Sequence, residues 1–427
     1  MKKTVFEKVS VANPLKISLS QQDKKVTLFE NLLCFSHLRW DFVYQRPQHL
    51  LSRFADNTNV YFLEEPVFTN TKEAFIVISQ KKERVWVCVP HLPENLNENQ
   101  KNESLEKLIQ LFFAGKDASE FIFWYYTPMA LEFSSHIKAG MTVYDCMDEL
   151  AAFKFAPQNI KHLENQLLER ADIVFTGGNT LFQSKKNSHK NIHPFPSSID
   201  KKHFLKARQK GIEPQDQVHI SGPKIGFYGV IDERFDIGLI EEIANTRPDW
   251  NIILIGPVVK IDPQTLPQNK NIHFLGPKNY DQLPLYLSGW DVAMIPFLIN
   301  ESTRFISPTK TPEYLCGGKP VVSTPITDVI NPYGADRLVS IANNAPDFIA
   351  EIAYWLESEN KGKWLSKVDR FLLTVSWDFT CSNMWDLMLN TLASKETAKN
   401  GSAKMPQKVF KTEKQYPDLI NQQARPA

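Results

Sequence analysis

Residues 292–325, VAMIPFLINESTRFISPTKTPEYLCGGKPVVSTP, are the most informative segment of the sequence. The segment begins with the apolar run Val292–Ile295, continues through a polar stretch and ends with a second apolar run, Pro320–Ser323. Strands that are buried on both faces appear as continuous apolar runs, and they occur in parallel sheets that helices cover. The segment therefore predicts a strand, a helix and a second strand of one parallel sheet.

The helix in this segment has two candidate starts. Ser307 followed by Pro308 is typical of an N-cap and a first helical position, and Gly317 marks the end of the helix. A later start at Thr311 also agrees with the sequence, because Pro312 cannot donate a hydrogen bond inside a longer helix.

Similar apolar runs recur in two series along the chain. The runs of the first half are Leu32–Ser36, Val60–Leu63, Val85–Val89, Phe121–Tyr125, Thr142–Asp145 and Ile173–Thr176. After a polar connection at 206–224, the runs of the second half are Ile225–Tyr228, Ile252–Ile255, Ile272–Leu275, Val292–Ile295 and Pro320–Ser323. Two such series predict an α/β protein with two doubly wound, Rossmann-like domains, in which ligands bind beyond the carboxyl ends of the strands.

The predicted organisation has five parts. They are an N-terminal extension (1–28), an N-terminal domain (29–208), a C-terminal domain (218–375), a helix that crosses back to the N-terminal domain (376–393) and a disordered tail (394–427). The extension and the tail are polar and have little to bury.

The composition is that of a globular protein, with 42% hydrophobic and 23% charged residues, and 427 residues are too many for one ordinary core. The formal net charge of +1 lacks the basic excess typical of nucleic-acid binding, so nucleic acid is not an expected partner. Five scattered cysteines without a CxxC pair argue against a disulfide framework and a structural zinc site. Neither a secretory signal nor an apolar stretch of roughly 18 to 20 residues is apparent, which predicts a cytoplasmic location.

Lys310 and Glu313 are the first candidates for a functional site. Lys310 lies at or beside the predicted helix N-terminus, where free N–H groups and the helix dipole favour a phosphate and a lysine adds a full charge. Glu313 is an acceptor-only side chain that suits paired sugar hydroxyls such as those of a ribose. Together they match the needs of a nucleoside diphosphate. The alternative is that both are surface residues of an ordinary capped helix.

Residues 307–322 resemble the P-x-K-x-x-E-Y-L-x-x-G-K-P-V-V signature of retaining GT-B glycosyltransferases of family four. The resemblance implies a GT-B fold, in which two Rossmann-like domains face each other across a cleft. It also implies that Lys310 contacts the donor diphosphate and that Glu313 contacts the donor ribose. Further donor-binding candidates in the same run are Ser307, Thr309 and Tyr314.

Three further segments resemble the same family in the same order. They are Ala171–Thr176, then Phe195–Phe204, which closes the first domain, and Gly226–Arg234, which begins the second. In the last of them, Gly229 lets the backbone approach the phosphates, and Arg234 adds a cation. Surface pairing of Arg234 with a neighbouring carboxylate is the alternative. The resemblance extends over residues 30–392.

The resemblance has one departure. Many members of the family carry a further Glu eight residues before the ribose Glu, and Phe305 occupies that position here. Asn300, Glu301 and Thr303 lie nearby in the sequence and are candidates for contacts to the transferred sugar.

The N-terminal half carries a second motif. Residues 36–50 resemble the S-H-x-R-W-D-x-x-x-Q-R-P-Q-H motif of a bacterial subgroup associated with cell-surface polysaccharides. We expect His37 and Arg46 to contact the transferred sugar or the donor phosphates. A purely structural role for His37 is the alternative.

Tyr144–Glu149 follows another predicted strand, at the place where relatives carry a His-Asp pair near the reacting sugar. Asp148, with Asp145 behind it, is the candidate for activating or orienting the acceptor hydroxyl, and helix capping is the alternative. These two residues and His37 are the catalytic candidates. A D-x-D metal motif is absent, so stabilisation of the leaving group by Lys310 and Arg234, without metal or cofactor, is the simpler expectation.

The predicted function is transfer of a hexose, with retention, from a nucleotide-diphosphate sugar to a surface-glycan acceptor. UDP is favoured as the nucleotide by the habit of the family, and the acceptor is a glycan or a lipid-linked glycan. Weak peripheral membrane contact through Lys185, Lys186, Lys190, Lys201 and Lys202 is one interpretation of these lysines, and scattered, solvated surface lysines are the favoured alternative. Two alternatives remain open. One is a nucleotide-sugar epimerase on the same fold, and the other is a non-catalytic scaffold protein that binds a sugar nucleotide.

Overall fold

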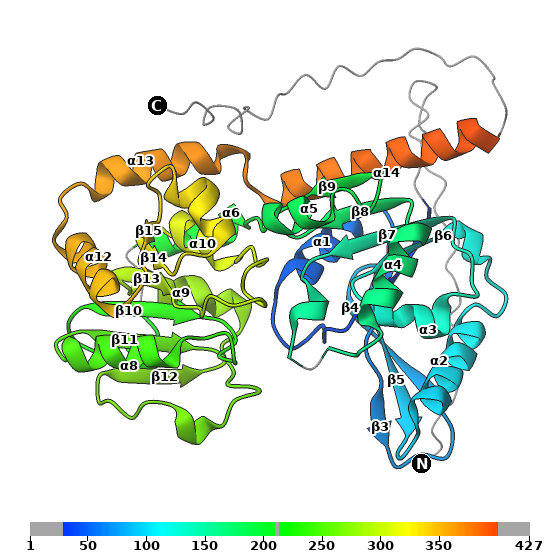
Figure 1. Cartoon of the computed structure of the whole chain (residues 1–427), viewed down its shortest axis with the longest axis horizontal. Helices are drawn as coiled ribbons and strands as arrows, with labels where there is room; N and C mark the ends of the chain where they lie inside the picture. Colours follow the sequence, from blue (N-terminus) through cyan, green and yellow to red (C-terminus); the bar gives the residue numbers. More distant parts are fainter. Residues whose placement is uncertain (1–28, 155, 210–212, 400–427) are drawn as a thin grey trace.

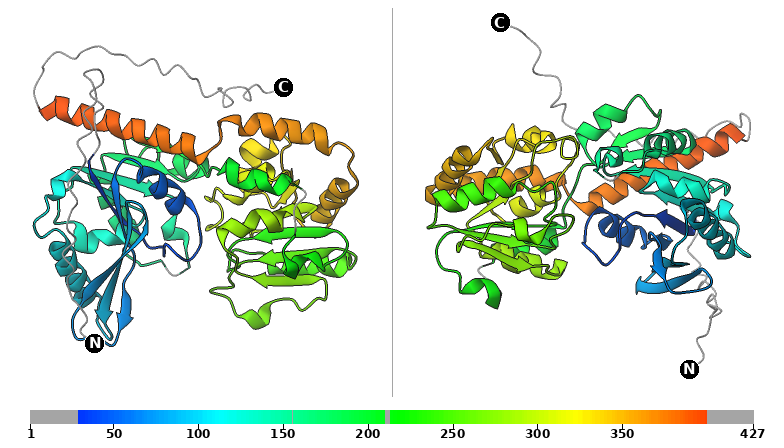
Figure 2. Two further views of the ribbon diagram at one scale, coloured as in Figure 1. Left: turned by 180° about the vertical axis from the view of Figure 1, so that it is seen from behind. Right: turned by 60° about the horizontal axis from the view of Figure 1, so that its bottom comes forward.

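The structure is a computed structural model that describes residues 29–154, 156–209 and 213–399 (Figure 1). The predicted extension at 1–28 lies outside these residues, as does the predicted tail from residue 400 onward. Two α/β domains lie side by side, and a long C-terminal helix runs along the N-terminal domain (Figures 1 and 2).

The N-terminal domain is built on a sheet in which the described residues form nine strands, in the order β3-β5-β2-β1-β6-β7-β8-β9 with β4 paired to β5. The strands are β1 (Asn31–Phe35), β2 (Asn59–Leu63), β3 (Val67–Thr69), β4 (Phe75–Lys82), β5 (Val85–Pro93), β6 (Phe121–Tyr125), β7 (Met141–Cys146), β8 (Ile173–Thr176) and β9 (Ile192–Pro194). The helices are α1 (Arg46–Phe54), α2 (Glu98–Phe112), α3 (Leu131–Ser134), α4 (Ile160–Arg170) and α5 (Asn179–Lys185). The short helix α6 (Lys201–Phe204) follows β9 but packs on the C-terminal domain, where Phe204 belongs to the core. All pairs are parallel except β4 with β5.

The C-terminal domain has a parallel sheet of six strands in the order β12-β11-β10-β13-β14-β15. The strands are β10 (Lys224–Tyr228), β11 (Asn251–Ile255), β12 (Ile272–Gly276), β13 (Val292–Ile295), β14 (Val321–Ser323) and β15 (Ser340–Ile341). The helices are α8 (Ile237–Thr246), α9 (Leu283–Ser288), α10 (Lys310–Cys316), α11 (Thr327–Val329), α12 (Ala345–Glu357) and α13 (Lys361–Phe371), and α7 (Gln215–Val218) precedes β10. The predicted class of two doubly wound domains is confirmed.

Burial on both sides of each sheet explains why the strands appear in the sequence as continuous apolar runs. In β1, Leu32 and Cys34 pack into a core on one face, while Leu33 and Phe35 pack into a separate core on the other. Alternate residues of a strand point to opposite faces, so a strand covered twice needs apolar residues at every position.

The last helix, α14 (Trp377–Lys399), belongs to the core of the N-terminal domain (Figure 1). Trp377, Cys381, Met384 and Met388 share one face at spacings of three and four residues, and all are buried in that core. The helix extends six residues beyond the predicted limit of residue 393, so the predicted tail at 394–399 is wrong. Lys395 anchors this extension, because its Nζ lies 2.7 Å from Asp172.

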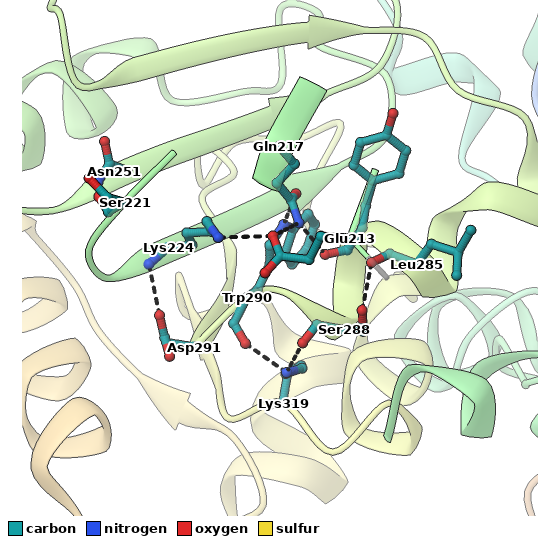
Figure 3. A network of polar contacts seen from close by, with 11 residues as sticks. Glu213, Gln217, Ser221, Lys224, Asn251, Leu285, Ser288, Trp290, Asp291 and Lys319 are labelled. Carbon is teal, nitrogen blue, oxygen red and sulfur yellow. Dashed lines mark hydrogen bonds and ion pairs between the residues drawn. The ribbon is translucent and has the colours of Figure 1, made fainter. Parts of the chain in front are cut away.

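A polar network holds the connection between the domains onto the C-terminal sheet (Figure 3). The side chain of Glu213 accepts hydrogen bonds from Lys224 and Gln217, and Gln217 in turn accepts one from the indole of Trp290. Lys319, the lysine of the G-K-P-V-V run, donates to the carbonyls of Ser288 (2.8 Å) and Trp290 (2.7 Å). This part of the motif is therefore structural.

Candidate active site in the interdomain cleft

A cavity of about 400 Å³ lies between the two domains. The N-terminal domain contributes the connections that follow β1, β7 and β8, and the C-terminal domain contributes those that follow β10, β11, β12 and β13, together with α10. As the doubly wound pattern predicts, the cavity lies beyond the carboxyl ends of the strands. The predicted site residues that line it are Arg46, Asp148, Gly229, Arg234, Ser307, Thr309, Lys310 and Glu313.

The helix that carries Lys310 starts between the two predicted positions, after Ser307 and before Thr311. It begins at Lys310, and its N-cap Thr309 makes no side-chain capping hydrogen bond. Ser307 does not cap the helix, because its hydroxyl faces the other domain and accepts a hydrogen bond from the backbone N–H of Ser197 (3.2 Å). Pro312 is accommodated in the first turn, where a helix does not require its N–H groups. Both predicted starts, Ser307 and Thr311, are therefore wrong.

Lys310 lies in a partly apolar pocket at the cleft. Its Nζ is 5.5 Å from the ring centre of Phe227 and 5.6 Å from that of Phe297. Burial lowers the pKa of Lys310 to about 8; Glu313 opposes this shift, and Arg234 reinforces it. An anion bound beside Lys310 would stabilise its charged form and raise this pKa again, so the site favours a phosphate group.

Glu313 is held one turn away on α10. It is 5% exposed, and its Oε2 accepts a hydrogen bond of 2.8 Å from the hydroxyl of Tyr228. Burial raises the pKa of Glu313 to about 7, against the opposing effects of that hydrogen bond and of Lys310. The carboxylate therefore has both a fixed orientation and free acceptor capacity toward the cleft.

Two glycines let the strand ends approach this pair closely. At Gly229, where φ is +143°, a Cβ atom would lie 2.2 Å from Cε of Lys310. At Gly256, where φ is +144°, a Cβ atom would lie 1.8 Å from the carbonyl oxygen of Gly229. Only residues without a side chain fit at either position. Gly256 was not predicted, although its place directly after β11 was a usable signal.

Arg234 lines the cleft but is held by a neighbouring carboxylate. Its guanidinium donates to both oxygens of Asp232, with the shortest contact at 2.7 Å. The group also lies 5.8 Å from the ring centre of Phe153 in the N-terminal domain. The bidentate pair fixes Arg234 at the wall of the cavity, where it adds a cation near Lys310.

Arg46 and Asp145 form a buried ion pair beneath the cleft. Nη2 of Arg46 lies 2.8 Å from Oδ1 of Asp145, and Nη1 donates to the carbonyl of Phe195 (2.7 Å). Asp145 has no exposed surface and does not line the cavity. Its assignment as a catalytic group is therefore corrected to a positioning role, because its carboxylate is saturated by the guanidinium.

Asp148 lies above this pair and lines the cleft. Burial raises the pKa of Asp148, with Arg234 and Arg46 acting in the opposite direction. A carboxylate with a raised pKa accepts a proton more readily near neutral pH, as a group that activates a hydroxyl requires.

Two other candidates lie outside the cavity wall. His37 is not among the lining residues, and burial lowers its pKa to about 4, so its imidazole is neutral at pH 7. Tyr314 is fully buried, and its hydroxyl accepts a hydrogen bond from the backbone N–H of Tyr228 (2.9 Å). Neither residue lines the cavity, and their predicted roles in binding and catalysis remain predictions.

The two domains touch across the cleft at several points. The carboxylate of Asp328 accepts hydrogen bonds from the backbone N–H groups of Asn179 (2.8 Å) and Thr180 (2.9 Å) at the start of α5. At the cavity, the ring of Tyr44 stacks on that of Tyr280 with centroids 4.3 Å apart. Phe305, which stands where the related family has Glu, packs against the core of the N-terminal domain. Asn300, Glu301 and Thr303 do not line the cavity.

Among the residues that the structure describes, no group of three His, Cys, Asp or Glu side chains could hold a metal ion. Over the same residues, no helix has both the length and the apolar character to cross a bilayer. All five cysteines are free and buried.

Residues 222–358 match the model of the family described as "Glycosyl transferases group 1". Over 220 residues the chain is 26% identical to TuaH of Bacillus subtilis (strain 168), which is named as a teichuronic acid biosynthesis glycosyltransferase. That match covers 47% of this chain and 54% of the relative, so the chain spans about half the length of the curated relative it matches.

Solved structures share the two-domain fold over more than four fifths of this chain. Sucrose-phosphate synthase from Thermosynechococcus elongatus matches with a TM-score of 0.64 and 14% identity, over 86% of this chain and 100% of that one. HepE of Anabaena in complex with UDP and glucose matches with a TM-score of 0.60 and 14% identity, over 84% of this chain and 99% of that one. The protein therefore has the GT-B fold.

Proposed function

We propose that this chain is a glycosyltransferase that takes a hexose from a nucleotide-diphosphate sugar and transfers it, with retention, to a surface-glycan acceptor. The observation that carries the proposal is the placement of Lys310 and Glu313 on one helix face at the interdomain cleft. The match of residues 222–358 to group 1 glycosyl transferases supports this assignment. UDP is the favoured nucleotide, since the solved structure of HepE, which shares the fold, contains UDP and glucose.

In this proposal the donor diphosphate lies between Lys310, Gly229 and Arg234. The lysine supplies charge in a partly desolvated site, where electrostatic stabilisation of a leaving diphosphate is strong. Because α10 has only seven residues, the side chain of Lys310 rather than the helix dipole carries this interaction. Glu313 accepts hydrogen bonds from the ribose hydroxyls. These residues need no metal or other cofactor to neutralise part of the charge.

The acceptor side of the proposal rests on Asp148. It lines the cavity from the N-terminal domain, and in this proposal it orients or deprotonates the acceptor hydroxyl. Asp41 also lines the cavity, but it pairs with Lys81 (2.6 Å). The likeness to a protein named for teichuronic acid biosynthesis supports a cell-surface glycan as the acceptor class.

Thermal unfolding in the presence of a panel of nucleotide sugars tests the donor site. The true donor should raise the melting temperature of the wild-type chain, and Lys310→Ala should lose most of that increase. Lys270→Ala is the matched control, because Lys270 is an exposed lysine of the same domain that does not line the cleft. Equal stabilisation of Lys310→Ala and wild type would remove Lys310 from the site.

The same donor then tests Asp148. Asp148→Asn should keep donor stabilisation and lose transfer to an acceptor by at least about a hundredfold, the usual contribution of a positioned acid or base. Full transfer activity in this variant would exclude the assignment. Donor turnover without any second sugar would indicate the epimerase instead, and donor binding without any turnover would indicate the scaffold protein.

A further inference from the structure

A second cavity, of about 530 Å³, lies wholly within the N-terminal domain. It opens at the carboxyl ends of β1, β2 and β6, where its wall includes Phe35, Leu63 and Thr127. The remaining walls come from the connection between β2 and β3, from β3, α2 and α3, and from the connection that precedes α4. None of the residues that line it lines the interdomain cavity.

The floor of this cavity is apolar and partly aromatic. The rings of Phe35 and Phe133 lie 6.2 Å apart at an angle of 59°, and Leu63, Leu105 and Met129 surround them. Phe68 stands at the edge with 46% of its surface exposed. Aromatic and aliphatic groups of this kind can pack against the C–H face of a sugar ring.

The rim is acidic. It carries the carboxylates of Glu64, Glu65, Glu98 and Glu132, and the one lysine in it, Lys101, is paired with Glu98. Two of the carboxylates have fixed orientations. Glu64 accepts the backbone N–H of Trp40 (2.8 Å) and pairs with Arg39 (3.0 Å), and Glu132 accepts the side-chain amides of Asn102 (3.2 Å) and Asn159 (2.9 Å).

The second cavity neighbours the cleft through two shared connections. Ser36 lines the second cavity, and Trp40, four residues later in the same connection after β1, lines the cleft. In the connection between β7 and α4, Asp148 lines the cleft, and Pro157 lines the second cavity. The two walls are also in direct contact, because the backbone N–H of Trp40, in the cleft wall, donates to Glu64, in the wall of the second cavity (2.8 Å). The second cavity is therefore adjacent to the cleft, on the side that carries Asp148.

We propose that this second cavity is a binding subsite for an uncharged or amino-bearing sugar unit of the acceptor. The inference rests on the proposed function. Ionised carboxylates only accept hydrogen bonds, so they suit the donors of sugar hydroxyl and ammonium groups. The same carboxylates repel a sugar that carries a phosphate or a carboxylate. The subsite thereby selects acceptors by charge.

Saturation-transfer-difference NMR on the full chain, with UDP present at saturation, tests the proposal. The probes are cellobiose (neutral), glucosamine (cationic), glucose 6-phosphate (anionic) and octyl glucoside. The variant Glu65→Lys/Glu98→Lys reverses two exposed charges of the rim, and Glu241→Lys/Glu242→Lys makes the same change on the exposed face of α8 as a control.

We expect cellobiose and glucosamine to bind the wild type and the control at least tenfold more tightly than glucose 6-phosphate. The rim variant should reverse that order, while its thermal stabilisation by UDP stays at the wild-type value. Unchanged sugar preference in the rim variant would overturn the subsite. Binding of octyl glucoside without cellobiose would also overturn it and assign the cavity to an alkyl chain. If UDP did not raise the melting temperature of the wild type, the proposed function itself would be contradicted.

Discussion

At the scale of single residues, Gly229 determines whether Lys310 can reach the cleft. An alanine Cβ there would lie 2.2 Å from Cε and 2.7 Å from Nζ of Lys310, and a φ of +143° disfavours any side chain. Gly229→Ala should therefore displace Lys310 and weaken nucleotide binding at least tenfold, as measured by titration calorimetry. Gly276→Ala is the control, because Gly276 has a φ of +69° but an added Cβ meets no atom within 4 Å. Similar losses in both variants would show that backbone strain, not contact with Lys310, causes the effect.

The ionised form of Glu313 should favour nucleotide binding but lower the stability of the folded chain, so both effects should depend on pH. Burial raises its pKa from 4.5 to about 7, so the ionised form is less stable in the folded chain than in the unfolded one. The stability that this shift contributes is complete below pH 4.5 and is lost as the pH rises through about 7.

Glu313→Gln removes the ionisation and keeps an acceptor for Tyr228. Its melting temperature without ligand should exceed that of the wild type at pH 8, and the difference should shrink toward pH 5. Nucleotide affinity at pH 8 should fall about tenfold or more, because bonds to a charged acceptor contribute about 1.5–3 kcal/mol. A variant that is less stable than the wild type at pH 8 would contradict the burial that we assign to this carboxylate.

Single residues also show what the sequence could and could not predict about the site. The sequence predicted four residues that line the cleft, Lys310, Glu313, Gly229 and Asp148. Each of them belongs to a motif that lies within one short segment, so its spacing can be seen in the sequence alone. The pairing of Arg46 with Asp145 was missed, since the two residues are 99 positions apart and neither segment indicates the other. For the same reason, the motif pointed to Asp145 as a catalytic group although its partner makes it structural.

At the scale of elements, Asp328 joins the two domains by capping a helix of the opposite domain. It accepts two backbone N–H groups at the start of α5 and the hydroxyl of Thr180 (2.5 Å). Asp328→Ala should cost about 0.5–2 kcal/mol of stability, the usual range for a cap, and should speed hydrogen exchange in α5. Asn344→Ala is the control, because Asn344 caps α12 within its own domain. Equal exchange in α5 for both variants would exclude a link between the domains at Asp328.

The elements themselves were predictable to different degrees. Strands with continuous apolar runs, such as β6 and β11, were found because double burial leaves a clear pattern. The strand β4 was missed although Phe75–Ile78 is an apolar run. It pairs only with β5, and its side chains are mostly exposed, so the link between an apolar run and burial on both faces does not hold for it. The start of α10 was missed because the hydroxyl of Ser307 accepts a hydrogen bond from Ser197 of the other domain. Rules for helix capping consider only neighbouring residues in the sequence, so they do not include such a partner.

At the scale of the whole molecule, α14 makes the N-terminal domain depend on the end of the chain. Trp377, Cys381, Met384 and Met388 fill the core under α1, and the backbone N–H of Trp377 donates to the carbonyl of Ile199 (3.0 Å). Burying one large apolar side chain contributes about 1.5–3 kcal/mol, so the loss of all four is comparable with the total stability of a typical domain, about 5–15 kcal/mol.

Truncation at two points tests this dependence. A chain that ends at Lys399 should keep the melting temperature and the nucleotide response of the full chain. A chain that ends at Ser376 should unfold in two steps, with fast hydrogen exchange in β1 and β6. The six-stranded sheet of the C-terminal domain, the domain whose helix α10 carries Lys310 and Glu313, should stay protected. Transfer should be lost, because the domain that carries Asp148 no longer folds. A single cooperative transition in the shorter chain, at the temperature of the full chain, would show that the N-terminal core is complete without α14.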